Sequence, residues 1–182
     1  EVYRIDELAA SLKIADENLQ NYLNGVSDTG VVDSAKLLEN VNPFFRVINP
    51  QNPQTDQATG KQFFSANIGS VLMQDTGVFY YYMNNDVVKN ALPADAKFLL
   101  GIEEKADKGN QRFFQLYAVK TLPGTEKAPL EGEGVKLARQ DFDEKGKPAI
   151  KMEMTSLGSK TWARLTAKNV GRPIAIALDD IV

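Results

Sequence analysis

The last third of the chain has the pattern strand, strand, helix, strand, which is typical of a sheet covered by helices. Two strand-like stretches, 138–143 and 149–154, flank the hairpin sequence Lys-Gly-Lys-Pro. A helical pattern begins at Ser156, and the apolar, strand-like stretch 174–178 follows it, with its Ile and Leu residues on one face. Residues 179–180, both aspartate, come where a tight turn should follow. This order predicts an α+β fold, in which helices cover one face of an antiparallel sheet.

The beginning of the chain predicts a strand and then a helical region. Residues 2–5 favour a strand, and apolar residues recur at helical spacing from Asp6 towards Gly25. Asp16 is also a plausible helix start, so one broken helix and two helices are both open. A further short helix is expected at 34–38.

The aromatic-rich middle of the chain predicts a large insertion of mixed structure. An apolar strand is expected at 66–73, and 97–103 and 112–120 are expected to form a β-hairpin. Alternation along 98–102 places Phe98, Leu100 and Ile102 on one face of the first hairpin strand. The aromatic run at 79–83 favours a helix over a strand, although both are open.

Composition excludes several classes of function. The 182 residues carry a net charge of -3, which argues against a nucleic-acid partner. The chain has no cysteine and no histidine, so it lacks a thiol nucleophile, the commonest general base and the commonest metal ligand. Its carboxylates lie mostly in polar connectors, so we expect no enzyme activity and no cofactor. No apolar run approaches the roughly 18 residues that span a bilayer, and both ends look cut, so we expect a piece of a longer protein.

Residues 146–180 contain a Gly-x-Pro hairpin, an alternating strand, a small-residue helix around an aromatic, Thr-x-x-Asn-Val-Gly-Arg, and an apolar strand ending in Leu-Asp. This pattern resembles that of SecD, and of the fused SecDF protein, of the bacterial protein-export apparatus. Residues 128–143 and 92–105 are similar to the family as well. The family usually has Gly after Leu-Asp, where this chain has Asp180. A type I′ turn needs positive φ at both central positions, so either the turn is of another type or Asp180 adopts the left-handed region.

The resemblance implies a domain in two parts. Residues 1–10 and 129–182 would form a ferredoxin-like base that is truncated at its C-terminal hairpin, and residues 11–128 would form a large inserted α+β head. Gly132 and Gly134 fall where the head rejoins the base. They are candidate hinge residues, with ordinary loop glycines as an equal alternative.

By the same resemblance, the chain would be a periplasmic domain of a Sec translocon accessory protein in the bacterial inner membrane. Such proteins associate with the SecYEG channel, bind the emerging unfolded preprotein and couple proton-driven movement to translocation. Their proton-carrying residues lie in the membrane parts of SecD and SecF, so no catalytic residue is expected here. The alternative is an exported ligand-binding module, for a glycan or a peptide, that shares only the sheet topology.

Binding an unfolded chain requires exposed aromatic or aliphatic surface. The competing interpretation is that the aromatic residues of the head fill its own core, although four consecutive aromatics at 79–82 cannot all face inward. The candidate binding residues are Phe44, Phe45, Phe79, Tyr80, Tyr81 and Tyr82.

Four cations, Lys160, Arg164, Lys168 and Arg172, recur at a spacing of four residues and so form one stripe. This stripe is a candidate surface for anionic lipid headgroups or for a channel subunit. The competing interpretation is a solvated helix face, in which Arg172 lies at the negative end of the helix dipole.

Overall fold

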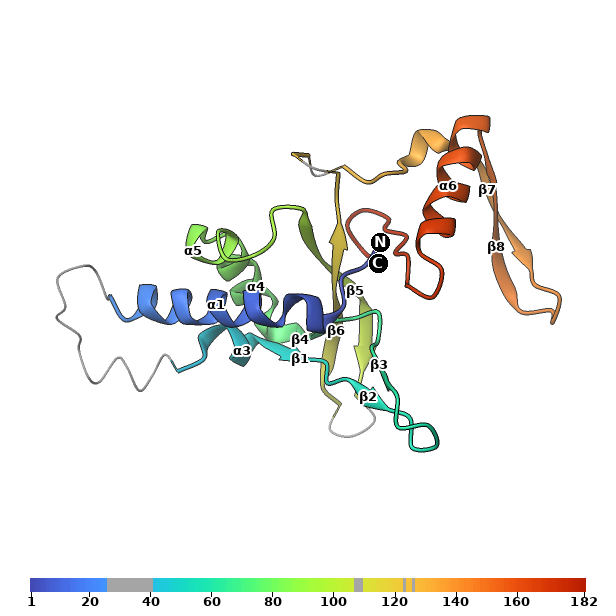
Figure 1. Ribbon diagram of the computed structural model, residues 1–182. Coiled ribbons are helices and arrows are strands. Elements are labelled where there is room, and N and C mark those ends of the chain that lie inside the picture. Colours follow the sequence, from blue (N-terminus) through green and yellow to red (C-terminus); the bar gives the residue numbers. More distant parts are fainter. Residues whose placement is uncertain (26–40, 107–109, 123, 126) are drawn as a thin grey trace.

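The chain folds into a larger part around a four-stranded sheet and a smaller part made of one hairpin and one helix (Figure 1). The short helix predicted at 34–38 lies outside the described residues. The computed structural model describes residues 1–25, 41–106, 110–122, 124–125 and 127–182.

The sheet of the larger part is antiparallel throughout. Its strands follow one another in the order β1 (Ile48–Pro50), β4 (Gly69–Leu72), β6 (Arg112–Lys120) and β5 (Ala96–Lys105). β5 and β6 pair with each other, which confirms the hairpin predicted from the sequence. Side chains alternate along each strand, so the sheet has two faces, and the described helices pack against one of them.

β5 departs from the predicted pattern beyond Leu100. The register of β5 on β6 shifts between Leu100 and Glu103. One extra residue in a strand turns the side chains that follow it to the other face. Ile102 is therefore 69% exposed, whereas Phe98 and Leu100 pack in the core. The prediction that all three share one face is wrong for Ile102.

Helices of the described chain cover one face of this sheet (Figure 1). They are α1 (Ile5–Leu23), α3 (Pro43–Val47), α4 (Thr76–Met83) and α5 (Asp86–Lys89). α1 packs against α3 and α5, and α3 packs against α4. α1 is one continuous helix, neither broken nor divided at Asp16, so both alternatives predicted for this region are wrong. Gly25 follows the helix at φ 65°, as predicted for its terminator. The aromatic run at 79–83 is helical, within α4.

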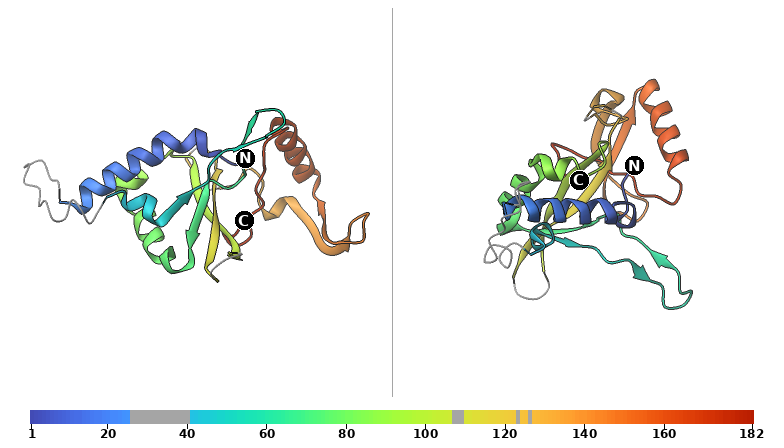
Figure 2. Two further views of the ribbon diagram at one scale, coloured as in Figure 1. Left: turned by 90° about the horizontal axis from the view of Figure 1, so that it is seen from below. Right: turned by 60° about the vertical axis from the view of Figure 1, so that its left-hand side comes forward.

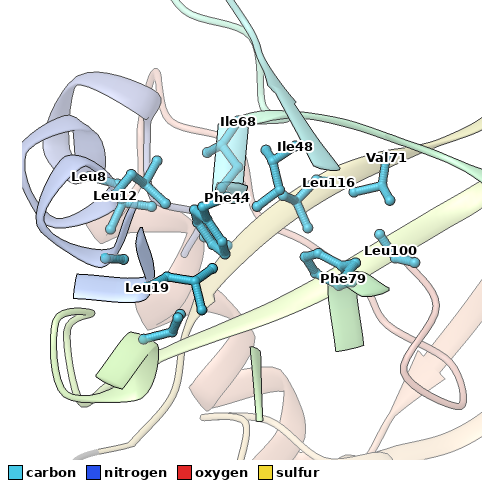
Figure 3. Close-up of a cluster of buried hydrophobic side chains, with 13 residues drawn as sticks. Leu8, Leu12, Leu19, Phe44, Ile48, Ile68, Val71, Phe79, Leu100 and Leu116 are labelled. Carbon is cyan, nitrogen blue, oxygen red and sulfur yellow. The ribbon is translucent and has the colours of Figure 1, made fainter. Parts of the chain in front are cut away.

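The core lies between these helices and the sheet (Figure 3). α1 contributes Leu8, Leu12 and Leu19, each no more than 1% exposed, and this confirms the helical spacing of its apolar residues. Full burial of one such side chain contributes about 1.5–3 kcal/mol, so this cluster is the main source of stability. The other elements contribute Phe44, Ile48, Val71, Phe79, Val88, Leu100, Leu116 and Ala118.

The smaller part consists of β7 (Val135–Phe142), β8 (Pro148–Met154) and α6 (Ser156–Lys168), all close to their predicted positions. The two strands pair antiparallel and form a sheet of their own. Phe142 and Ile150 lie on one face of the hairpin and are 65% and 72% exposed. Figure 2 shows this hairpin extending outward from the larger sheet, as does the short hairpin of β2 (Gln54–Thr55) and β3 (Gln62–Phe63).

Both ends of the chain meet the larger sheet (Figure 1). Val2 forms an antiparallel bridge with Val119 in β6 and is 2% exposed. Ile181 forms a parallel bridge with Leu100 in β5. Val2 therefore belongs to the same sheet as residues of the predicted head.

The strand predicted at 174–178 is wrong for most of its length. A strand needs a neighbour for its backbone groups, and within the described chain only Leu178 has one, in a bridge with Ile181. The tight turn between them is present. Asp179 and Asp180 have φ values of 50° and 62°, so both take the positive φ that a type I′ turn requires. Asp180 thus adopts the left-handed region where the family usually has glycine.

These helices and antiparallel strands confirm the predicted α+β class. The ferredoxin-like base and the inserted head stay predictions. The smaller part, as described, contains one hairpin and one helix of the predicted base.

Candidate binding surfaces

Helix α4 presents one apolar side to the core and a second apolar side to solvent. Phe79 is 1% exposed and Tyr82 packs against the core. The helical period turns Val78, Tyr80 and Tyr81 outward instead. The exposed fractions run from 42% for Val78 to 59% for Tyr81. The outward set also includes one residue of the preceding turn η1 (Met73–Asp75). We define the α4 face by its exposed apolar side chains: Met73, Val78, Tyr80 and Tyr81.

The α4 face has the chemistry of an interaction site. A helix that is apolar all round is usually buried on all sides, and exposed apolar patches mark binding sites. Gly77 lies between Tyr80 and Tyr81 on the helix surface, and a β-carbon there would meet no atom within 4 Å. Tyrosine combines an apolar ring with a polar tip, so it contacts varied partners while staying hydrated.

Two of the six predicted aromatic binding residues are buried instead. Phe44 and Phe79 are 0% and 1% exposed, and Figure 3 shows both inside the core. A side chain enclosed in the core offers no surface to a partner, so these two are corrected to core residues. Phe45 and Tyr82 are half-buried and pack against the core. Tyr80 and Tyr81 belong to the α4 face.

Asp16 has a structural role that its place in the sequence pattern did not predict. Its Oδ1 accepts hydrogen bonds from the backbone N–H of Phe44 at 2.8 Å and of Phe45 at 3.4 Å. Asp16 therefore caps the start of α3 from the middle of α1. Burial raises the pKa of the Asp16 carboxyl, and the two backbone hydrogen bonds oppose this rise. A lone acid between Leu12 and Leu19 on the buried stripe of α1 is the sequence signal for it.

A groove of about 420 Å³ lies where the end of α3 meets the outward face of β1, β4 and β6. Alternation along the strands turns Asn49 and Ser70 to this face, because their neighbours Ile48 and Val71 face the core. The mixed lining suits a short polar or peptide ligand, which is the chemistry of the alternative function. The groove is lined by Arg46, Val47, Asn49, Ser70, Leu72, Gln111 and Phe113.

Gly134 is bound to the start of α6. Its carbonyl oxygen accepts a hydrogen bond from the backbone N–H of Thr155 at 3.0 Å. A β-carbon on Gly158 would overlap that carbonyl group, so the two glycines allow the closest approach of η2 (Gly132–Gly134) to α6. Gly132 has open space around its α-carbon. The hinge role of Gly132 and Gly134 stays a prediction.

The predicted cationic stripe divides into two groups. Lys160, Arg164 and Lys168 are exposed on α6, opposite the half-buried Trp162 and Leu165. Arg172 lies beyond the end of α6 and is engaged in ion pairs of its own. The interpretation of the stripe as a partner or lipid surface therefore concerns the first three cations.

The ion pairs of Arg172 join distant segments. Its Nη1 lies 2.8 Å from Oε1 of Glu1 and 3.4 Å from Oε1 of Glu7. Glu1 Oε1 also accepts from Lys120 Nζ at 2.7 Å, and this hydrogen bond is the main reason that the pKa of Glu1 is lowered. The ammonium of Lys120 lies 4.6 Å from the ring centroid of Tyr3. This cluster ties the first residues to β6 and to the segment that follows α6.

In the part of the chain that the structure describes, no group of three or more His, Cys, Asp or Glu side chains is placed to hold a metal ion. None of the described helices combines the length and the apolar character needed to cross a bilayer.

Comparison with known proteins identifies the relatives of this chain. A family model described as the P1 head subdomain of SecDF matches residues 107–182. The protein translocase subunit SecD of Rhodothermus marinus is 31% identical over 173 residues, which cover 92% of this chain and 26% of that protein. SecD of Dictyoglomus turgidum is 42% identical over 55 residues, or 30% of this chain and 14% of that protein. No solved structure matches the chain.

The fold and these similarities define a periplasmic α+β domain of a protein-transport component of the Sec pathway. The chain belongs to the SecD/SecDF family, which confirms the resemblance found in the sequence. It spans about a quarter of the length of its R. marinus relative (26%). The family model of the head subdomain matches residues 107–182. Residues 129–182, predicted from the sequence to belong to the base, therefore lie within the range matched by a head model. That division stays a prediction.

Proposed function

We propose that this domain binds emerging, unfolded preprotein on the periplasmic side of the inner membrane. The exposed α4 face is the observation that carries this proposal. In the assembled apparatus the domain works beside the SecYEG channel, as part of a SecD or SecDF protein. It has no catalytic role of its own, and the proton-driven movement of the membrane parts is passed to it.

The α4 face suits a partner that has no fixed sequence. An unfolded chain presents scattered apolar side chains, and a small set of exposed aromatic and aliphatic groups binds many of them equally well. A contact of a few hundred Å² at about 25 cal/mol per Å² gives a gross gain of about 5–10 kcal/mol. Association costs about 4–15 kcal/mol, so the net binding is weak. Weak, reversible binding lets a moving chain be held and released.

Coupling to movement requires a link between the two parts of the chain. The cluster of Glu1, Lys120 and Arg172 supports such a link, because it connects β6 of the larger part to the segment that leaves α6. In this proposal, the smaller part follows the membrane-bound remainder of the protein and the larger part holds the preprotein. The predicted division, a base of 1–10 and 129–182 with a head of 11–128, differs from this arrangement in residues 1–10, which lie in the larger part.

Site-specific photocrosslinking tests the proposed binding. A photoreactive amino acid placed at Tyr81 of the full-length protein should form adducts with a preprotein stalled in the channel. The same group at Tyr22, which is 52% exposed on α1, serves as a matched aromatic control and should form few. Equal adduct yields at both positions would contradict a role for the α4 face. Tight competition by one defined sugar or short peptide would instead favour the ligand-binding module, with the groove as its site.

A further inference from the structure

Helix α6 exposes a face that combines three cations with one large apolar side chain. Leu157, Lys160, Arg164 and Lys168 follow one another at spacings of three and four residues, so they form one stripe along the helix. All four side chains are exposed, and Leu157 has 75% of its surface accessible. We define these four residues as the α6 face. Trp162 and Leu165 lie on the other side of the helix, which is half-buried.

The α6 face has no acidic partner within the described chain. The ion pairs of the described residues involve none of Lys160, Arg164 and Lys168. Residues 145–172 as a whole contain seven cations and one anion, Glu153. Like charges four residues apart on a helix repel each other at a cost of about 0.2–0.5 kcal/mol per pair. The arrangement therefore lowers stability slightly in isolation and is relieved by an external anion.

We infer that the α6 face docks on the anionic headgroup layer of the membrane. Lysine and arginine side chains reach headgroup phosphates while their aliphatic stems stay along the helix. Leu157 lies at the N-terminal end of the stripe, next to Lys160, where it inserts between headgroups as apolar residues of interfacial helices do. SecD is a membrane protein, so its periplasmic domain is held close to a bilayer and a weak contact suffices. This inference goes beyond preprotein binding and does not depend on it.

The expected strength follows from the number of charges. Each cation near an anionic surface strengthens binding about fivefold, so three cations strengthen it roughly 100-fold. The electrostatic part is screened over about 8 Å at physiological ionic strength, so it weakens as salt is added. The contribution of Leu157 is apolar and persists in salt. Docking of this kind is reversible and orients the smaller part on the bilayer.

Vesicle co-sedimentation of the 182-residue chain tests the inference. The chain should partition onto phosphatidylcholine vesicles that contain phosphatidylglycerol and much more weakly onto phosphatidylcholine alone. The triple variant K160Q/R164Q/K168Q should lose roughly 100-fold in partition onto the anionic vesicles. The matched control K13Q/K61Q/K89Q removes the same charge from exposed residues of the larger part and should retain most of the binding. Circular dichroism checks that both variants stay folded.

Two further measurements distinguish docking on lipid from docking on a protein. L157Q should weaken binding to anionic vesicles about tenfold at both low and high salt, because it removes apolar insertion. Equal partition of the natural chain onto neutral and anionic vesicles would contradict the inference, and so would equal losses in the two triple variants. If the natural chain ignores vesicles while K160Q/R164Q/K168Q abolishes crosslinks to a channel subunit in the full-length protein, the α6 face serves a protein partner and the inference is wrong.

Discussion

Arg172 and Glu1 are 171 positions apart in the sequence, and their side chains meet at 2.8 Å. Lys120 binds the same carboxylate oxygen of Glu1 from the end of β6. Three segments that are distant in sequence thus meet at one carboxylate. Glu1 is 30% exposed and Arg172 is 40% exposed, so solvent screens the cluster in part.

Removing the guanidinium of Arg172 should loosen this junction. We expect Arg172→Gln to lower the free energy of unfolding by about 0.5–1 kcal/mol, because partly exposed ion pairs contribute about that much. Arg164→Gln, which removes an exposed cation of α6, should change it by less than about 0.5 kcal/mol. Urea unfolding of both variants measures the difference. A double-mutant cycle with Glu1→Gln that gives no coupling energy would contradict a link between the two side chains.

The carboxylate of Glu1 should make stability depend on pH in a defined direction. Its pKa in the folded chain lies below the ordinary value of 4.5, mainly because of the hydrogen bond from Lys120. A lowered pKa means that the unfolded chain binds the proton more readily, so the stabilisation is present above pH 4.5 and is lost as pH falls through the lowered pKa. Unfolding at a series of pH values should show this loss in the natural chain and a smaller one in Glu1→Gln. A Glu1→Gln variant with an unchanged pH slope would show that Glu1 contributes nothing to it.

Asp16 should show the opposite pH dependence. Burial raises its pKa above the ordinary value of 3.8. The folded chain therefore holds the proton more tightly, and the contribution of Asp16 to stability decreases as pH rises from about that value through the folded pKa. Asp16→Asn keeps an oxygen that accepts from the N–H of Phe44, so it should remove the pH slope with little loss of stability. Asp16→Ala leaves that N–H without its acceptor and should cost about 1–2 kcal/mol at neutral pH. Equal stability of the Ala and Asn variants would rule out the capping role.

Because Gly158 lies against Gly134, replacing Gly158 by alanine should lower stability far more than replacing Gly77. A β-carbon at 158 would overlap the carbonyl group of Gly134, so Gly158→Ala should destabilise by about 1–3 kcal/mol. Gly77 in α4 has no atom within 4 Å of an added β-carbon, so Gly77→Ala should stabilise by about 0.5–1 kcal/mol. Thermal or urea unfolding compares the two. Two replacements with effects of the same sign would show that backbone contact does not distinguish these sites.

Local sequence patterns predicted those elements that are defined by their own residues. The hairpins of β5 with β6 and of β7 with β8, and the helix α6, follow from alternation, helical spacing and turn residues. The stretch 174–178 has an equally good strand pattern. Within the described chain, however, Leu178 is the one residue of this stretch that has a bridge partner, Ile181. Pairing is a property of two segments, so the pattern of one of them could not decide it.

The candidate surfaces depended on tertiary contacts in the same way. The run at 79–82 indicated that some of its aromatics must be exposed, but the packing of α4 on α3 determines that these are Tyr80 and Tyr81. The pairing of Arg172 with Glu1 has no local signal at all. At Asp180 the sequence indicated the tight turn correctly but left its geometry open. The turn forms with positive φ at a residue other than glycine.

The central claim is that the α4 face holds unfolded preprotein, and the most direct measurement is the translocation yield of the full-length protein with that face altered. Tyr80→Ser/Tyr81→Ser should weaken preprotein binding roughly 30-fold or more, and so reduce both crosslinking and translocation, because each exposed aromatic lost removes about 1–2 kcal/mol of apolar contact. Tyr22→Ser/Phe63→Ser removes two exposed aromatics elsewhere and should leave both near their natural levels. Translocation and crosslinking that are unchanged in the first variant, or reduced equally in both, would contradict the claim.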